Sequence, residues 1–572
     1  MPDGFLPLPA AAKGAFQGDD IADIVGQCTR RLAEMRTIRS SNFTTWRELS
    51  SYIYPTRGRF VQPPISNVGN RGAQVTQNIV DRTGTKAAKD LGSFLMAGIT
   101  SPARAWFRLG VNDAALNGLA PVRQWLDDVQ KRMLRVFAVS NFYAAMASLY
   151  EEVAVFGTAA MIVVEDFDTV IRCYPLTAGE YMLAADDRLQ VGTLYREYVL
   201  TAESMVAQFG AENCSPEVQN LYRSGALGRE ISICHAIEPN FRRQKGRKDW
   251  RGMPYLSIHF EAGRRRDQAL RIGGFHQRPF IAPRWDVVTT DVYGHGPGEE
   301  ALPDVKSLQF LQRRKAEAID KMVKPPLVGD SALANSVVSL LPGGLNFIPG
   351  GSAAGLRPVY TVPPNIQGLL EDIQERQQLI RQAFRTDLIA MFANSDRAQI
   401  TAREVDERHE EKLLMLGPML ERFHDEALNP IIDMVFGIML RGKLLPEPPQ
   451  ELAGRYIEPD YISLLAQAQK SIGTTSLERM VGFIGNVAAA VPGVLDKFNA
   501  DEAVEEYGEY LGVNTKVLRS EDEVGVIRQQ REQAAQQQQA AQMGMQAVQG
   551  AKVLSETETG GGKNALQMMT GL

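Results

Sequence analysis

The stretch PDVKSLQFLQRRKAEAIDKMVK at residues 303–324, together with NIQGLLEDIQERQQLIRQAFRTDLIAMF at 365–392, decides the fold of this chain. In both segments apolar residues recur at three- and four-residue steps, the pattern of an amphipathic helix. The first helix must stop where Pro325 and Pro326 follow, and Asn365 can cap the second. The sequence therefore predicts two long helices, of about 33 Å and about 42 Å, joined by a Gly- and Pro-rich excursion.

These two helices carry the first group of candidate functional residues. The first helix is basic on balance, with six basic residues against three acidic ones. Leu370 and Phe384 lie on the apolar stripe of the second helix. The candidate residues of the pair are Lys306, Arg313, Arg314, Lys321, Leu370 and Phe384.

A polar break and a third helix follow the pair. NSDRAQI at 394–400 has no long apolar run, and the next four residues, Thr401 to Glu404, form a capping-box sequence. We therefore expect a helix from Ala402 to about Arg441. Prolines at 418 and 430 should bend this helix, because each removes a backbone hydrogen bond.

The rest of the chain is of mixed type. The first 160 residues have helical periodicity, whereas short β-branched runs from Ala159 to about Val288 predict antiparallel strands. PEPPQ after Leu445 marks a boundary before a smaller helical unit from about Tyr461 to Ser520. Residues 528–550 contain ten glutamines and can extend a polar helix, and the C-terminal end has a flexible composition. The predicted fold class is α+β, mainly α.

Composition and motifs argue against several classes of function. The net charge of −5 over 572 residues lacks the positive field of a protein that coats nucleic acid. The sequence contains no Walker loop, no paired zinc-binding histidines and no G-x-S-x-G elbow. Four scattered cysteines indicate a reducing compartment, and no apolar run reaches the roughly 20 residues of a membrane span. We expect no catalytic residues, no metal site, no cofactor and no membrane segment.

One basic segment contains aromatic residues as well. Phe241, Trp250 and Tyr255 lie among clustered arginines and lysines, an arrangement that favours nucleic-acid backbones. A solvated hairpin tip, or a subunit contact that pairs with acidic residues elsewhere, would also explain it. The basic residues are Arg242, Arg243, Lys245, Arg247, Lys248, Arg251, Arg264, Arg265 and Arg266.

Three separated blocks, in order, resemble the head-to-tail connector, or portal, family of short-tailed, T7-like bacteriophages. The blocks are VDRTGTKAAKDLGSFLMAGITSPARAWFRL at 80–109, YGHGPGEEALPDVKSLQ at 293–309 and TAREVDERHEEKLLMLGPMLERFHDEALNPIID at 401–433. The resemblance covers roughly residues 20–520. It implies an elongated subunit of a dodecameric ring at one capsid vertex, with a central channel for double-stranded DNA during packaging and ejection.

The resemblance also implies an assignment of segments and partners. The segments are 1–160 (helical wing), 161–300 (α+β wing), 301–324 (first stem helix), 325–363 (clip), 364–393 (second stem helix), 394–400 (tunnel loop), 401–445 (long wing helix), 446–525 (crown) and 526–572 (Gln-rich tail). In the tunnel loop, Asn394, Ser395, Asp396, Arg397 and Gln399 would face the DNA. The implied partners are a terminase motor, tail adaptor proteins, and the major capsid and scaffolding proteins. The implied location is the virion, after assembly in the bacterial host cytoplasm.

Two other classes remain open from the residues alone. One is a DNA-packaging enzyme of the terminase type, which the missing Walker loop disfavours. The other is an assembly scaffold that does not bind DNA.

Overall fold

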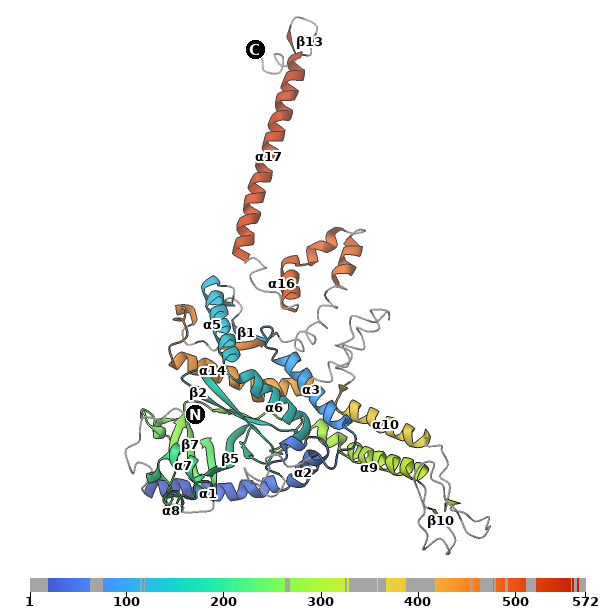
Figure 1. Cartoon of the computed structure of the whole chain (residues 1–572). Coiled ribbons are helices and arrows are strands. Elements are labelled where there is room, and N and C mark those ends of the chain that lie inside the picture. The colour runs from blue at the N-terminus through green and yellow to red at the C-terminus, as the bar shows by residue number, and fades with distance from the viewer. Residues whose placement is uncertain are drawn as a thin grey trace. The chain divides into compact units, whose positions relative to one another are not determined.

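The computed structural model describes most of the chain and divides it into two compact units, residues 1–469 and 470–572. The described residues are 19–61, 76–113, 116–117, 119–262, 268–324, 327–328, 357–358, 367–386, 417–452, 455, 457–462, 477, 480–488, 492–510, 521–556, 558–559 and 563–564. Figure 1 shows the chain coloured from its N-terminus to its C-terminus.

Helices dominate the N-terminal part of the first unit, as its periodicity predicts. They are α1 (Asp19–Ser40), α2 (Phe43–Tyr52), α3 (Thr83–Ile99), α5 (Ala120–Val139) and α6 (Phe142–Phe156). The apolar stripe of α1 is buried from Ile21 to Met35, but Ile38 at its end is 49% exposed. The apolar stripe of α1 in the sequence is therefore longer than the part of it that the fold buries.

Antiparallel strands form two sheets in the middle third, as expected. The strands are β2 (Ala160–Asp166), β3 (Val170–Leu176), β4 (Tyr181–Ala185), β5 (Val191–Thr201), β6 (Glu230–Pro239), β7 (Tyr255–Glu261), β8 (Arg271–Phe275) and β9 (Phe280–Ile281). One sheet has the order β4-β5-β6-β7-β8 and the other β3-β2-β9. The stripe of α1 packs against the larger sheet, next to which it lies in Figure 1. Two short helices, α7 (Ala202–Phe209) and α8 (Pro216–Arg223), build a small core with β6.

The glycines of YGHGPGEE make a close backbone approach possible. Gly157 ends α6 with a positive φ of 72°, and a side chain there would meet the backbone of Gly294 at 2.3 Å. A Cβ on Gly296 would lie 2.8 Å from the backbone of Gly157. The motif therefore serves packing between α6 and the start of the next helix.

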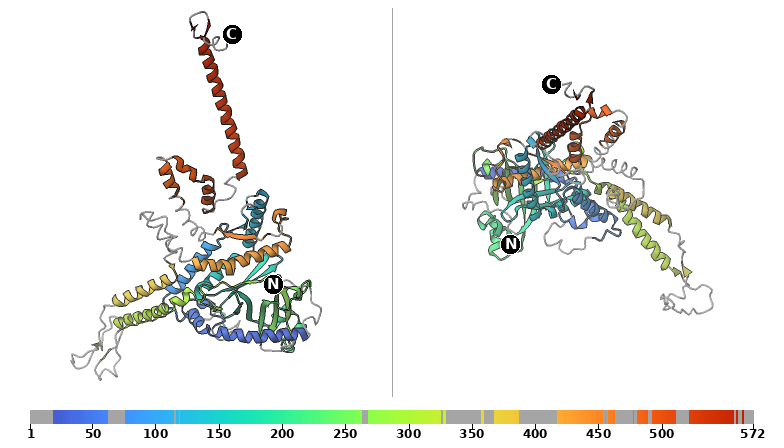
Figure 2. Two further views of the ribbon diagram at one scale, coloured as in Figure 1. Left: turned by 180° about the vertical axis from the view of Figure 1, so that it is seen from behind. Right: turned by 90° about the horizontal axis from the view of Figure 1, so that it is seen from above.

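That next helix, α9 (Pro297–Val323), begins six residues before the position that the sequence predicts. Pro297 occupies the first turn, and Pro303 lies inside the helix. Antiparallel to α9 lies α10 (Gln367–Ala383), and both views of Figure 2 show the two helices side by side, projecting from the rest of the first unit. Their inner residues join the largest core, which also contains residues of α2, α3 and α6.

The predicted third helix is described from Gly417 onward. It consists of α13 (Gly417–Phe423), the π-helical turn η5 (His424–Leu428) and α14 (Asn429–Arg441). Its expected start at Ala402 lies outside the described residues. Directly upstream of proline 430, where the sequence predicts a bend, the structure has a π-helical turn.

The first unit extends past Leu445, where the sequence predicts a boundary. Strand β12 (Ile457–Tyr461) pairs with β1 (Phe107–Val111), so these residues belong to the first unit and not to a separate helical one. The partners lie some 350 positions apart, with Phe107 opposite Tyr461, and no local pattern reveals this pairing.

The second unit is mainly helical in its described residues. It contains residues 480–488, the helix α16 (Ala500–Tyr510) and the helix α17 (Glu521–Glu556), which includes the glutamine-rich segment. A small ladder of β13 (Glu558–Thr559) and β14 (Lys563–Asn564) follows, in the segment whose composition predicts flexibility.

Candidate functional site

The pair α9 and α10 is the best-defined part of the candidate site. Phe384, directly after α10, is fully buried, whereas Leu370 is only half-buried. Arg376 on α10 donates a hydrogen bond to Asp304 on α9 at 2.8 Å. The stripe predicted for α10 therefore does pack, through Ile373, Ile380 and Phe384.

A polar cluster that sequence reasoning missed joins this pair to the N-terminal helices. The carboxylate of Asp81 accepts hydrogen bonds from Thr83, from Gln312 on α9 and from Gln377 on α10, the last two at 2.9 Å each. Gln309, 2% exposed, donates to the Asp81 carbonyl and accepts from its amide. Although burial acts in the opposite direction, the hydrogen bonds from Thr83, Gln377 and Gln312 lower the pKa of Asp81 overall. We call these residues the Asp81 cluster. It fixes both helices to the segment before α3.

The basic candidates on α9 are partly neutralised within the chain. Lys306 pairs with Glu48 at 2.8 Å, and Arg314 pairs with Glu317 at 2.9 Å. Arg313 donates to the Asn78 carbonyl at 3.5 Å, and Lys321 is exposed. The helix as a whole contains five basic and five acidic residues, because it starts at Pro297 and includes two further glutamates. The excess of positive charge expected for α9 is therefore confined to its distal part.

The distal half of α9 exposes apolar residues in the described part of the chain. Phe310, Ile319 and Val323 are 56%, 41% and 72% exposed, whereas Val305 and Leu308 are buried. Ile319 and Val323 continue the stripe of Val305 and Leu308 beyond the region that α10 and the N-terminal helices cover, whereas Phe310 lies on the opposite face of α9. An uncovered stripe of this kind is typical of a surface that another protein covers.

The excursion between the two helices begins and ends in a short antiparallel ladder. Leu327 and Val328 of β10 pair with Pro358 and Arg357 of β11. The other residues between 325 and 366, and the expected tunnel loop with Asn394, Ser395, Asp396, Arg397 and Gln399, lie outside the described residues.

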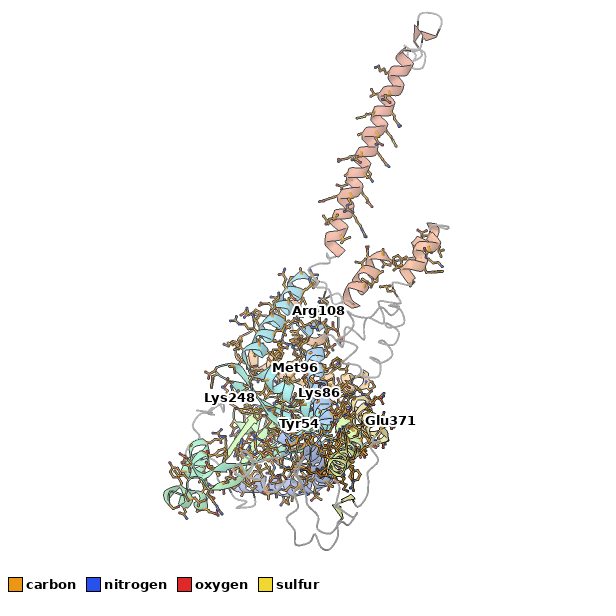
Figure 3. The ribbon with its side chains drawn as sticks, turned by 45° about the vertical axis from the view of Figure 1, so that its right-hand side comes forward. Tyr54, Lys86, Met96, Arg108, Lys248 and Glu371 are labelled. Carbon is orange, nitrogen blue, oxygen red and sulfur yellow. The ribbon has the colours of Figure 1, made fainter. Side chains whose placement is uncertain are left out.

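The basic segment forms the exposed connection between β6 and β7. Arg242 pairs with Asp23 of α1, Arg247 with Asp249 at 2.8 Å, and Arg243 donates to a backbone carbonyl at 2.9 Å. Figure 3 shows Lys248, in this connection, and Glu371, on α10, on opposite sides of the first unit. The segment is thus separate from the helix pair, and pairing with acidic residues accounts for part of its charge. Arg264, Arg265 and Arg266 lie outside the described residues.

A buried ion pair, also missed from the sequence, anchors the third helix. Arg284 is 4% exposed and binds Glu426 of η5 through its guanidinium and its backbone amide. The two residues are 142 positions apart, so no local pattern reveals the pair.

Two buried histidines border a cavity of about 220 Å³ between β6, β7, β8 and α14. The rings of His235 and His259 stack at 3.8 Å, and His235 shares a hydrogen bond with Ser257 at 2.9 Å. Burial, with a smaller contribution from Arg196 and Arg271, lowers the pKa of His235 to about 3. Burial also lowers the pKa of His259 well below its ordinary value.

We expect the melting temperature to fall when the pH is lowered from about 7.5 to about 5. In the unfolded chain these imidazoles take up protons near the ordinary histidine pKa of 6.5, whereas the folded state keeps them neutral. The unfolded state therefore binds more protons below that pH, and stability is lost progressively as the pH falls. The double variant H235Q/H259L should flatten this loss, while the exposed-site control H295Q should retain it. An unchanged loss in the double variant would show that the histidine pair is not its cause.

The described residues offer little support for metal or thiol chemistry. Within them, no group of three or more His, Cys, Asp or Glu side chains is placed to hold a metal ion. The four cysteines are buried, and burial raises the pKa of Cys28, Cys173 and Cys214 to about 12. None of the described helices combines the length and apolarity needed to cross a membrane.

Comparisons with known proteins agree along nearly the whole chain. The family model for the bacteriophage head to tail connecting protein matches residues 25–518. The chain is 44% identical over 523 residues to a probable portal protein of Bordetella phage BPP-1, covering 91% of this chain and 93% of the relative. It is also 44% identical over 532 residues to the portal protein of Salmonella phage epsilon15, covering 93% and 95%. Among solved structures, the virion of a native gene transfer agent particle aligns with 13% identity and a TM-score of 0.34, covering 74% of this chain and 89% of that one.

The family match and the two phage relatives coincide with the region that contains both sheets, the helix pair and the third helix. This chain therefore belongs to the bacteriophage head-to-tail connecting protein family.

Proposed function

We propose that the chain is the subunit of a dodecameric portal ring, which sits at one capsid vertex of the virion and conducts double-stranded DNA during packaging and ejection. The observation that carries the proposal is the 44% identity with two phage portal proteins over more than nine tenths of the chain. The subunit acts as a structural channel and not as an enzyme. It assembles in the bacterial host cytoplasm.

The uncovered apolar stripe of α9 supports a ring. Ile319 and Val323 of this stripe, and Phe310 on the opposite face of α9, are exposed in the single chain, at a cost in free energy that burial would remove. In a closed ring of identical subunits, one face of each subunit covers a different face of its neighbour. Such a ring needs no further protein to cover the stripe.

The order of the segments along the sequence supports roles for the remaining parts. The excursion closed by β10 and β11 is proposed as the clip that binds the terminase motor and tail adaptor proteins. The wing is proposed to contact the major capsid and scaffolding proteins. The segment 394–400 is proposed as the tunnel loop that faces the DNA.

Changing Arg397 to Glu should reduce the length of DNA packaged per particle while ring assembly stays intact. Twelve copies would place a ring of positive charge near phosphates, which contributes affinity that depends on salt and is independent of base sequence. The measurement is packaged DNA length in variant and parent particles at matched ring content.

The charge-conserving variant R397K serves as the matched control and should package nearly normal lengths. Equal lengths for R397E and parent particles would contradict a role of this residue in the channel.

A further inference from the structure

The turn η5 breaks the third helix at a position that the sequence dictates. Pro430 has no amide hydrogen, so the carbonyl of Glu426, four residues earlier, cannot receive its usual α-helical bond. The chain responds with a π-helical turn, in which the amide of Asn429 bonds to the carbonyl of His424 five residues before it. π-Helical turns are rare in proteins, and those that occur are often found at functional sites.

Several side chains of the turn η5 make contacts of their own with the rest of the fold. His424 stacks on Tyr461 at 4.0 Å, and Asp425 accepts a hydrogen bond from Asn429. Ala427 and Leu428 are fully buried. The turn is therefore a packed feature of the fold.

Glu426 makes the strongest of these contacts. Its carboxylate accepts hydrogen bonds from the Arg284 backbone amide at 2.9 Å and from Nε at 3.0 Å, and also from Nη2. Arg284 further donates to the carbonyls of Leu189 at 2.9 Å and Asp291 at 3.3 Å. One buried guanidinium thus connects the β4–β5 turn, the loop after β9 and the third helix.

We propose that the Arg284–Glu426 pair holds the π-helical turn and thereby sets the rotation of α13 relative to α14. Each residue of an α-helix turns the chain by about 100°. The conformation of η5 therefore determines how α13, which precedes it, is rotated about the helix axis. Pro430 determines only where the α-helical hydrogen bonds are interrupted. The buried ion pair determines the conformation of the π-helical turn, because the pair holds Glu426 on the side of the helix that faces Arg284.

The consequence for the channel rests on the proposed function. In sequence, α13 follows the segment 401–416, which the tunnel loop 394–400 precedes. On that function, Arg284 and Glu426 are positioning residues for α13, the first described helix after that loop in the sequence.

Hydrogen exchange of the purified full-length protein tests the pair without DNA. In the variant E426Q, amides of residues 417–428 should exchange at least tenfold faster, while those of α9 and of α14 after its first turn keep the parent rate. R284K keeps the charge but not the forked contacts, and should behave like E426Q. The control is R422Q, because Arg422 lies on α13 and forms a more exposed ion pair with Asp286 at 3.2 Å. This variant should change the exchange rates less than twofold.

A double variant separates rotation from general stability. R284M/E426L removes both charges together, which buried sites tolerate better than the loss of one partner. Its melting temperature should lie above that of E426Q, although the Leu189 and Asp291 carbonyls lose a donor. Exchange at 417–428 should stay as fast as in E426Q. The double variant decides the question even where E426Q gives no folded protein. Parent-like exchange in the double variant, or faster exchange spread evenly through the first unit in E426Q, would overturn the proposal. Either result would leave the portal assignment untouched, and a failed Arg397 experiment would not affect this one.

Discussion

Replacing Phe384 with alanine is expected to lower the free energy of unfolding by about 3 to 5 kcal/mol and to loosen α10 from α9. The ring of Phe384 is fully buried and belongs to the core that also contains Ile380 and residues of α3 and α6. Deleting a buried aromatic side chain removes its transfer free energy and leaves a cavity. Thermal unfolding and assembly mass, measured at matched protein concentration, report the effect.

The control is Leu370→Ala on the same helix. Leu370 is only half-buried, so its loss should cost roughly 1 kcal/mol. If F384A were as stable as L370A and formed assemblies of normal mass, the packing described for the helix pair would be wrong.

Replacing residues 331–355 with a short Gly/Ser linker should abolish binding of motor and tail proteins while rings still form. The ladder of β10 and β11 holds the two ends of this segment side by side, so a short linker can join them without moving α9 or α10. The pair of α9 and α10 stays anchored through the Asp81 cluster, which the replacement does not touch. Binding of the terminase motor and of tail adaptor proteins to purified rings is the measurement.

A matched control carries the same linker in the exposed turn 225–228, between α8 and β6. This variant should bind both partners normally. Normal tail attachment by rings that lack residues 331–355 would refute the assignment of the clip.

The parts of the fold that local patterns encode are predictable from the sequence. The helix pair follows from apolar residues at helical spacing, and the antiparallel strands follow from short β-branched runs between turns. The predicted start of α9 is six residues late. Proline is common in the first turn of a helix, so Pro303 indicates a start there, but Pro297 occupies the first turn in the structure. Apolar periodicity also extends to Ile38 and Ile319, which the single chain leaves exposed.

Contacts between distant residues cannot be predicted in the same way. Asp81 meets Gln312 across 231 positions, and the ion pair of Arg284 joins residues 142 positions apart. Nothing in the residue types near either position distinguishes a buried partner from a solvated side chain. The expected tunnel loop rests on the family resemblance, and its role is the subject of the Arg397 experiment.

Cryo-electron microscopy of the purified full-length chain tests the central claim most directly. The account predicts a closed ring of twelve subunits around an axial channel, with Phe310 and Ile319, on opposite faces of α9, covered by the two neighbouring subunits, and with residues 394–400 facing the axis. A monomer, an open filament, or a ring in which the α9 stripe stays in solvent and residue 397 lies on the outer surface would contradict it.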